Sequence, residues 1–472
     1  MNKDLNVFRN IVLITIDSLR ADHLGCYGYK QKTSPNIDKL AKNGVLFSKC
    51  ISNSPTTLTS FRTILTSTYP TMYNDRYLSK KRTTIAEVLQ KKGLHTAGFH
   101  SNPFLSKYYG YDRGFDVFYD SVFFNQLISE DKLKGKVESI LNWMRYAFFT
   151  LTCHAFGTPH ESIDKINRKV LYWLDENQRD FFLWVHYMDV HYPYISPKKY
   201  LKQFTSIKKS KALKLNIKLV KNPDDLKESE IEQLISLYDA GIKYVDEGIK
   251  KIVEKLEEKG IIDDTLLIIT ADHGDEFFDH GGFGHSMTTA YGDKFFKPLF
   301  GGGGDTVSAF GTRFGYPPNL YDELLHVPLI FYSPNILKSL VIDTQVQLLD
   351  IPPTLADAAK MDKITDFLGQ SVLPLINNEK SYENKGVISE NVGVKSAIKR
   401  SYRTEKWKLI VNEDKKCELY NLQKDPKEQK NIASDNPKKL EELIINMLNE
   451  KKQAEKAIIK KTLSKINLKT KN

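Results

Sequence analysis

Largely apolar runs alternate with amphipathic segments through most of the chain. A run that is apolar on both faces predicts a strand that is buried on both sides. Such runs cover residues 11–16, 95–100, 181–186, 266–271 and 327–332. Between them, apolar residues recur every three or four positions, which predicts helices over 34–43, 83–92, 163–176 and about 228–259. This alternation predicts an α/β fold in which helices sandwich a mostly parallel central sheet.

The pattern changes after about residue 358. Short alternating runs separated by turns predict a small antiparallel sheet, and a lysine-rich amphipathic helix is expected over 437–461. We therefore divide the chain into a main α/β domain, residues 1–365, and a small C-terminal α+β subdomain, residues 366–472.

Three segments lack a regular pattern and are expected as loops: residues 101–160, 192–225 and 287–319. The last of these contains four consecutive glycines, several aromatic residues and two consecutive prolines. It is too polar and too interrupted for a core segment, so we expect an inserted loop. Because it directly follows a histidine-rich segment, it is also a candidate lid.

The charge balance of the chain is mildly basic. The 472 residues include 69 lysines and arginines against 58 aspartates and glutamates, a net charge of +11. No compact basic motif with interleaved aromatic residues accompanies this surplus, so no nucleic-acid partner is expected. The four cysteines lie far apart without a CxxC pair, which indicates neither a zinc ribbon nor a disulfide framework.

No targeting or membrane-spanning segment is expected. The chain passes from MNKDLNVFRN straight into the first apolar run, without a signal peptide. The most apolar long stretch, residues 140–156, is interrupted by Arg145 and polar residues and is expected to form a half-buried helix or cover. These features predict a cytoplasmic protein without a transmembrane segment.

Titratable residues end or follow four of the predicted strands: Asp17, His100, His186 and the pair Asp272–His273. Parallel strands end at one common edge of the sheet, where open α/β proteins bind their ligands. Asp17 taken alone is also a candidate helix cap. Together with Asp272 and His273, however, it offers oxygen and nitrogen donors that suit Mn²⁺, Zn²⁺ or Mg²⁺.

A run of hydroxyl residues precedes a short amphipathic segment. Phe61, Ile64 and Leu65 recur at helical spacing, so a helix is expected to begin near Thr57 to Thr59. One of the hydroxyls is expected to cap this helix. Alternatively, a threonine at the helix N-terminus acts as a nucleophile, because the helix dipole and free N–H groups stabilise an alkoxide and an incoming anion.

Several longer motifs occur together: ITIDSLRADHLGCYGY, SPTTLTSFRTILTSTYP, FFLWVHYMDVHYPY, ADHGDEFFDHGGFGH, NLYDELLHVPLIFYSP and ELYNLQKDPKEQKNIA. With these motifs in family order over about residues 10–435, the chain resembles the sulfatase family of the alkaline phosphatase superfamily. The resemblance implies a metal-dependent hydrolase of sulfate or phosphate esters whose substrate is a small-molecule, glycan or lipid ester. It also implies one divalent metal ion (Mn, Zn or Ca) and leaves the oligomeric state open.

The resemblance implies roles for individual residues. Asp17, Asp272 and His273 correspond to metal ligands of the family. Thr57 falls where the family keeps its nucleophile, which also contacts the metal.

Five further residues correspond to the part of the family pattern that contacts the substrate. His191 matches a histidine at the ester or leaving group, and His285 stands where many members have a lysine. Both are therefore expected to be catalytic. His100, Asn102 and His186 fall in or beside the substrate-binding segments and are expected to bind substrate.

The segment around Thr57 departs from the formylglycine signature C/S-x-P-x-R of many sulfatases. Threonine cannot be converted to formylglycine, Phe61 stands at the arginine position, and Ser18 replaces the second aspartate of the DD pair. This pattern resembles superfamily members that use an unmodified threonine or serine. We expect Thr57 to form a covalent ester that water hydrolyses. The alternative is a transferase of the phosphoglycerol or phosphoethanolamine type, acting on a lipid or glycan.

Some polar residues near these motifs have plainer interpretations. His160 is expected at the surface or as a satisfied core residue. Asp275 and Glu276 are expected to start a helix and face solvent. Arg62 lies one position off the family register and is not expected to reach the substrate.

Overall fold

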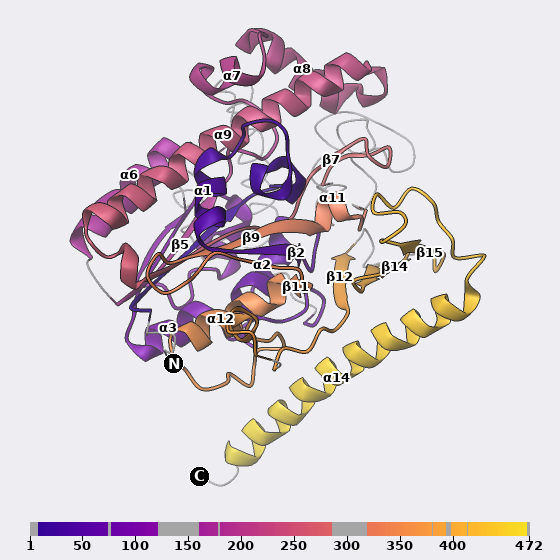
Figure 1. The fold of residues 1–472 in the computed structure, drawn as a ribbon. Helices are drawn as coiled ribbons and strands as arrows, with labels where there is room; N and C mark the ends of the chain where they lie inside the picture. Colours follow the sequence, from indigo (N-terminus) through magenta and orange to yellow (C-terminus); the bar gives the residue numbers. More distant parts are fainter. Residues whose placement is uncertain are drawn as a thin grey trace, which may run out of the picture.

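The chain folds into a large α/β domain beside a small sheet that is flanked by a long C-terminal helix (Figure 1). This computed structural model describes residues 8–73, 77–120, 160–177, 180–285, 319–379, 381–392, 398–412 and 414–469. Apart from residue 319, the insertion expected at 287–319 lies outside the described residues, as does the apolar stretch 140–156.

Within the described residues, the central sheet has nine strands, in the order β10-β2-β9-β6-β1-β5-β3-β4, with β11 paired to β2. Their bounds are β1 Asn10–Ile16, β2 Val45–Ile51, β3 His95–His100, β4 Val117–Asp120, β5 Phe181–Tyr187, β6 Thr265–Ala271, β9 His326–Tyr332, β10 Leu340–Ile342 and β11 Val346–Gln347. All neighbours pair in parallel except at β9, which is antiparallel to both β6 and β2. The expectation of a mostly parallel sheet is confirmed.

The reversed direction of β9 determines what lies near the strand ends. Because β9 runs against its neighbours, it begins at the edge where the parallel strands finish. The short helix α11 (Asp322–Leu325) leads directly into β9 and therefore lies at that edge. All seven side chains of the central strand β1 are buried, as expected for a strand that is covered on both faces.

Helices cover both faces of the sheet in two groups whose members pack on one another (Figure 1). One group is α1 (Pro35–Asn43), α6 (Ile163–Glu176) and α9 (Glu228–Glu258). The other is α2 (Thr57–Thr66), α3 (Ile85–Lys92) and α12 (Ile351–Ala358), followed by the short α13 (Leu373–Ile376). The four helices expected between the strands are present within about two residues of their predicted bounds.

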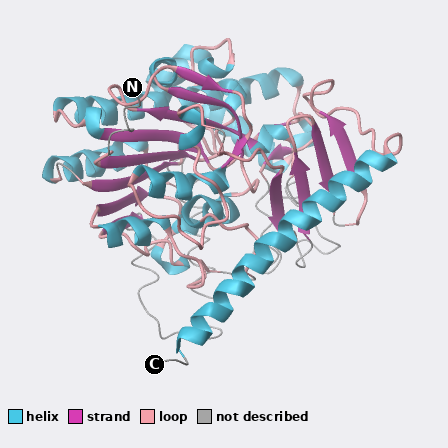
Figure 2. Ribbon diagram, turned by 60° about the horizontal axis from the view of Figure 1, so that its bottom comes forward, coloured by secondary structure: helices cyan, strands magenta, loops and turns pink. Residues whose placement is uncertain are grey.

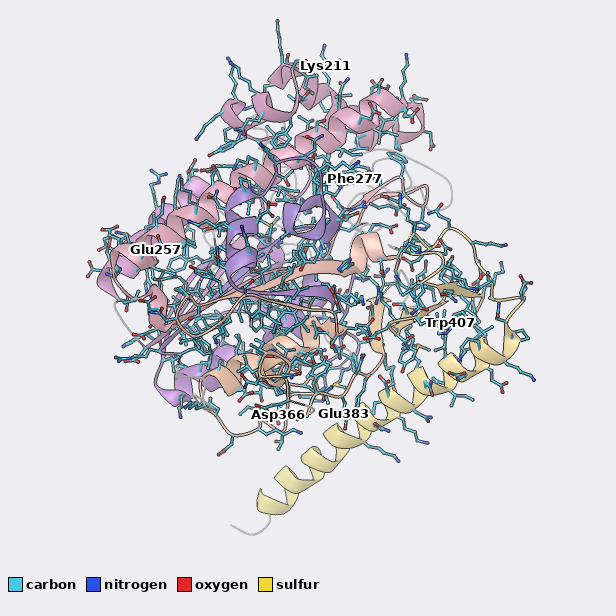
Figure 3. The ribbon with its side chains drawn as sticks, viewed as in Figure 1. Lys211, Glu257, Phe277, Asp366, Glu383 and Trp407 are labelled. Atoms are coloured by element: carbon cyan, nitrogen blue, oxygen red, sulfur yellow. The ribbon has the colours of Figure 1, made fainter. Side chains whose placement is uncertain are left out.

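The expectation of a loop over 192–225 is wrong for most of that segment. It forms α7 (Lys198–Phe204) and α8 (Lys209–Lys221), which pack against α9 and carry Lys211 at the outer end of this lobe (Figure 3). Ala212, Leu215 and Leu219 of α8 are buried at helical spacing. The many lysines between them obscure this apolar stripe in the sequence.

The C-terminal region contains an antiparallel sheet of β12 (Val387–Val392), β13 (Ile398–Arg403), β14 (Trp407–Val411) and β15 (Cys417–Asn421). Helix α14 (Pro437–Lys469) crosses this sheet and buries Leu443 and Met447 against it (Figure 2). The expectation of a small α+β subdomain is confirmed, and its boundary near residue 365 stays a prediction. None of the helices in the described ranges combines the length and apolarity needed to cross a lipid bilayer.

Candidate active site

The ends of β1, β5 and β6 bring acidic and imidazole groups to one edge of the sheet. Ile16, the last residue of β1, is in register with Ala271 of β6. Asp17 and Asp272 therefore leave neighbouring strands at the same level. Both side chains and the ring of His273 are fully buried.

Thr57 reaches the same point from the other direction, as the first residue of α2. Its hydroxyl oxygen lies 3.2 Å from Nε2 of His273 and donates to Oδ2 of Asp17 over 3.4 Å. The structure thus brings together Asp17, Thr57, Asp272 and His273, which come from three elements far apart in sequence.

The donor atoms of this cluster fit a divalent cation. One ligand atom each from Asp17, Asp272 and His273 lies within 4.8 Å of the others. Oδ1 of Asp272 accepts from the backbone N–H groups of His273 (2.9 Å) and Ser18 (3.2 Å), whereas Oδ2 is buried without a hydrogen-bond partner among the described residues. Nδ1 of His273 donates to the carbonyl oxygen of Gly274 at 2.8 Å, so Nε2 keeps its lone pair for a metal.

The ionisation of the two buried carboxyls differs. Burial opposes ionisation of Asp17, but His191, His186 and His273 together hold its pKa well below the ordinary value. Burial and the neighbouring Asp17 charge raise the pKa of Asp272 well above the ordinary value. A cation bound between them would offset both charges, because attraction to a cation favours the ionised form of each carboxyl.

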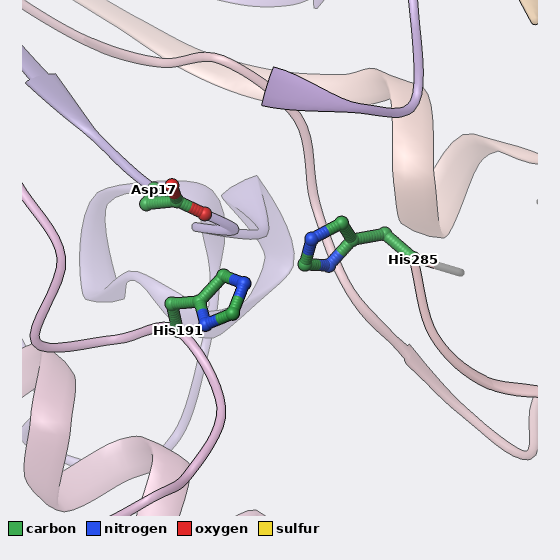
Figure 4. Close-up of side chains that lie close together, drawn as sticks. All are labelled: Asp17, His191 and His285. Carbon is green, nitrogen blue, oxygen red and sulfur yellow. The ribbon is translucent and has the colours of Figure 1, made fainter. Parts of the chain in front are cut away.

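Two more histidines face the Asp17 carboxylate from separate segments, as Figure 4 shows. The rings of His285 and His273 are 4.2 Å apart between centroids, and those of His285 and His191 are 4.9 Å apart. Nδ1 of His285 donates to Oδ1 of Asp275 at 2.9 Å, and Nδ1 of His191 donates to the carbonyl oxygen of Tyr192.

The two imidazoles differ in basicity because of these partners. Burial works against protonation of His285, but the hydrogen bond and charge of Asp275 raise its pKa above the ordinary value. Burial lowers the pKa of His191, although the Asp17 charge opposes this effect.

The expectation that Asp275 and Glu276 start a helix and face solvent is wrong. Both are buried, and Glu276 begins a two-stranded hairpin of β7 (Glu276–Phe277) and β8 (Phe283–Gly284). The reason is the apolar anchor of the hairpin, since the ring of Phe277 packs on Tyr194 and Tyr238 and draws its neighbours inside.

The three residues expected to bind substrate are placed differently from one another. Nδ2 of Asn102 donates to Oδ2 of Asp17 at 3.1 Å, and Nε2 of His186 lies 3.4 Å from the same oxygen. His100 instead packs between Phe118 and Trp184, with ring centroids 5.1 and 5.3 Å away. Burial lowers the pKa of His100 well below the ordinary value, as expected for a neutral core imidazole.

Sequence reasoning missed two residues of the cluster. His160 interacts electrostatically with Asp17, His186 and His191, and burial lowers its pKa to about 4. No motif singles out this histidine. Ser18 adopts a left-handed backbone (φ 59°), and its Oγ donates to Oδ1 of Asp17 at 2.7 Å. The position of Ser18 directly after Asp17 in the sequence was the signal that could have identified it.

The two nearby arginines bind groups outside the cluster. The guanidinium of Arg20 binds Asp22 and Asp279, and that of Arg62 donates to the carbonyl oxygen of Pro70. The ring of Phe61, at the position of the family arginine, packs on His186 and Trp184 with centroids 4.9 and 5.3 Å away. An aromatic ring therefore occupies the position at which the family signature has a charged arginine.

The profiles of two known protein families match this chain. Residues 9–361 match the profile of the family described as Sulfatase, and residues 312–457 match that described as N-sulphoglucosamine sulphohydrolase, C-terminal. An arylsulfatase of Clostridium perfringens (strain 13 / Type A) is 24% identical over 491 residues, covering 90% of each chain. Arylsulfatase K of Homo sapiens is 21% identical over 472 residues, 90% of this chain and 78% of its own length. Arylsulfatase K of Bos taurus aligns over only 221 residues, at 27% identity, which are 44% of this chain and 35% of the bovine protein.

The fold is shared with solved structures. Phosphonate monoester hydrolase of Agrobacterium radiobacter superposes with a TM-score of 0.69, at 19% identity over 94% of this chain and 96% of that one. The structure of BT4656 in complex with its substrate D-glucosamine-2-N,6-O-disulfate gives a TM-score of 0.65, at 19% identity over 95% and 98% of the two chains. Since the Sulfatase profile covers well over half of the chain, the chain belongs to the sulfatase family.

Proposed function

We propose that this protein is a metal-dependent hydrolase of sulfate or phosphate-type esters that uses Thr57 as its nucleophile. One observation supports this most directly. The Thr57 hydroxyl lies within hydrogen-bond reach of both Asp17 and His273, at the N-terminus of a helix and beside an unpartnered carboxylate oxygen of Asp272. A hydroxyl in such a place is activated and oriented for attack.

Asp17, Thr57, Asp272 and His273 would hold one divalent ion. Bound there, the ion would supply a Lewis acid for an ester oxygen and lower the pKa of the Thr57 hydroxyl. Carboxylate and imidazole donors suit Zn²⁺ and Mn²⁺, whereas Ca²⁺ prefers oxygen ligands alone. We therefore favour Zn²⁺ or Mn²⁺ over Ca²⁺.

The residues divide the reaction between them. Thr57 gives its proton to solvent water, and its oxygen bonds to phosphorus or sulfur as the bond to the leaving oxygen breaks. The leaving oxygen takes a proton from His191 or His285, the two imidazoles beyond Asp17. Water then hydrolyses the Thr57 ester, releases the sulfate or phosphate product and restores the hydroxyl. Asn102 and His186 hold Asp17 in place through its Oδ2.

The relatives indicate the class of substrate. They include arylsulfatases, a phosphonate monoester hydrolase and a protein bound to a sulfated glucosamine. Aryl sulfates, phosphonate monoesters and O-sulfated sugars each carry a tetrahedral ester group with a single negative charge. We propose a sulfate ester or a phosphonate or phosphodiester for this chain, on a small molecule or a glycan.

The test compares Thr57→Ala with wild type on aryl sulfate, phosphodiester and phosphonate substrates after loading with Zn²⁺ or Mn²⁺. Turnover is expected to fall by about 10³-fold or more. Thr56→Ala is the matched control, since that hydroxyl is bonded to Thr59 at 2.5 Å. Near-normal turnover of Thr57→Ala would refute the nucleophile. Product analysis with and without an added acceptor alcohol separates hydrolysis from the alternative, transfer to a lipid or glycan.

A further inference from the structure

A second set of metal-ligand side chains shares the Asp17 carboxylate. We propose that Asp17, His191 and His285 form a second cation site suited to Zn²⁺, so that two ions flank Asp17. The family pattern gives the two histidines direct contact with the substrate, and the sequence indicated one ion only. This second site would lie on the leaving-group side of the proposed reaction, so the inference rests on the proposed function.

The distances support a single ion. One donor atom each from Asp17, His191 and His285 lies within 4.8 Å of the other two. Ligands at about 2.1 Å from one Zn²⁺ stand roughly 3.4 Å apart in a tetrahedral site. To reach this spacing, the two rings, which face the carboxylate in Figure 4, would move toward it when an ion binds. Two imidazoles and one carboxylate leave the fourth position of Zn²⁺ open, as in catalytic zinc sites.

The hydrogen bonds made by the Nδ1 atoms of His191 and His285 support the same conclusion. A metal-binding histidine commonly donates its other ring N–H to a carboxylate or a backbone carbonyl, which fixes the tautomer. Nδ1 of His285 has the Asp275 carboxylate at 2.9 Å, and Nδ1 of His191 has the Tyr192 carbonyl. Asp275 is itself held by a hydrogen bond from the Tyr194 hydroxyl at 2.5 Å. Each Nε2 therefore has no hydrogen-bond partner among the described residues, and its lone pair is available for an ion beside Asp17.

The charge of the site also calls for a second cation. Asp17, Asp272 and Asp275 are all fully buried, and within the described chain none pairs with a lysine or arginine side chain. Arg20 contacts only the backbone carbonyl of Asp275, at 3.2 Å. One divalent ion offsets two carboxylates. The third, Asp275, is paired with the imidazole of His285 alone among the described side chains that carry positive charge, and an anionic ester adds a further negative charge. Buried charges without partners are costly, and a second ion removes that cost.

When bound, a second ion would supply a Lewis acid for the leaving oxygen. His191 and His285 would then act as its ligands rather than as proton donors. Asp275 would be a positioning residue, acting through His285.

The test is the zinc content of the full-length chain, stripped with a chelator and reloaded with Zn²⁺ alone. Elemental analysis and calorimetric titration should find two ions in wild type and one in His191→Ala and His285→Ala. Asp275→Asn preserves volume and should weaken only one of the two sites, by about 10–100-fold. His280→Gln is the matched control, since that imidazole also bonds a carboxylate (Glu323, 2.6 Å) five residues before His285 but lies outside the cluster. It should keep both ions.

A single ion in wild type at saturating Zn²⁺ would overturn the inference, as would two ions in both histidine variants when circular dichroism shows them folded. Anomalous scattering at the zinc edge checks the position, and two peaks flanking Asp17 are expected. These outcomes are separate from the proposed function. One ion together with an inactive Thr57→Ala refutes only the second site. Two ions together with a fully active Thr57→Ala refute only the nucleophile.

Discussion

The Thr57 hydroxyl lies 3.2 Å from Nε2 of His273, whose Nδ1 is committed to the carbonyl oxygen of Gly274. This pairing fixes the tautomer of the imidazole and directs its lone pair at the hydroxyl and at the Asp17–Asp272 pair. The proposed nucleophile and the proposed cation ligands are therefore held in one orientation before any substrate arrives. Such preorganisation is what catalysis by positioned groups requires.

Asp272→Asn should stabilise the metal-free chain while removing a proposed metal ligand. Burial and the Asp17 charge raise the pKa of Asp272 well above 3.8, so its protonated form favours folding and this stability is lost as pH rises from about 4 through the folded pKa. An amide cannot ionise and is expected to raise stability at pH 7 by about 1–3 kcal/mol. Thermal unfolding with chelator at pH 5 and pH 7 measures this, and the pH dependence should flatten in the variant. A lower melting temperature of the variant at pH 7 would contradict the expectation.

His280→Gln should remove a pH-dependent contribution to stability. Burial opposes protonation of His280, but the hydrogen bond to Glu323 raises its pKa to about 9. A raised pKa means that this stability is complete below the ordinary pKa of 6.5 and is lost as pH rises toward 9. The difference in melting temperature between wild type and His280→Gln should thus be larger at pH 6 than at pH 9.5. A constant difference across this range would show that the imidazole stays neutral.

Lys408→Ala should weaken the joint between the two parts of the chain. The Lys408 side chain is fully buried, and its ammonium lies 2.8 Å from Asp322 of α11 and 2.7 Å from Glu428. Removing one partner of a buried ion pair leaves uncompensated charge and costs about 3–5 kcal/mol. Urea unfolding measures the loss. The control is Lys416→Ala, whose ion pair with Asp414 is exposed and should matter little.

Phe61→Arg should not restore the signature of other sulfatases. The Phe61 ring is fully buried against His186 and Trp184. An arginine side chain at this position would therefore lack space, and the substitution makes no carboxylate available to pair with its guanidinium. Burying an unpaired charge should cost several kcal/mol of stability, whereas Phe61→Leu should cost less than about 2 kcal/mol. Chemical denaturation of both variants distinguishes the two effects. A stable and more active Phe61→Arg would mean that the arginine finds the substrate after all.

The sequence alone determined the alternation of five buried strands with four helices in the main domain and the edge at which the candidate chemistry lies. Local apolar patterns predict buried strands over residues 11–16 and 266–271, and Asp17 and Asp272 directly follow these strands. Parallel strands must end at one edge, so the meeting of these two carboxyls follows from topology. The fold class and the family could therefore be predicted, because each depends on local periodicity or on motifs.

Only the tertiary structure decided which side chains meet across separate segments. The bond from His285 to Asp275, the approach of His160, and the loss of Arg62 to the Pro70 carbonyl depend on how a hairpin, a loop and a helix pack. Asp275 looked like a solvated helix start because its neighbours in sequence are acidic, yet the anchor ring of Phe277 buries it. Local pattern specifies which face of an element is apolar. Contacts between elements arise from packing the whole chain, so the approach of His191 and His285 to each other beside Asp17 became visible only in three dimensions.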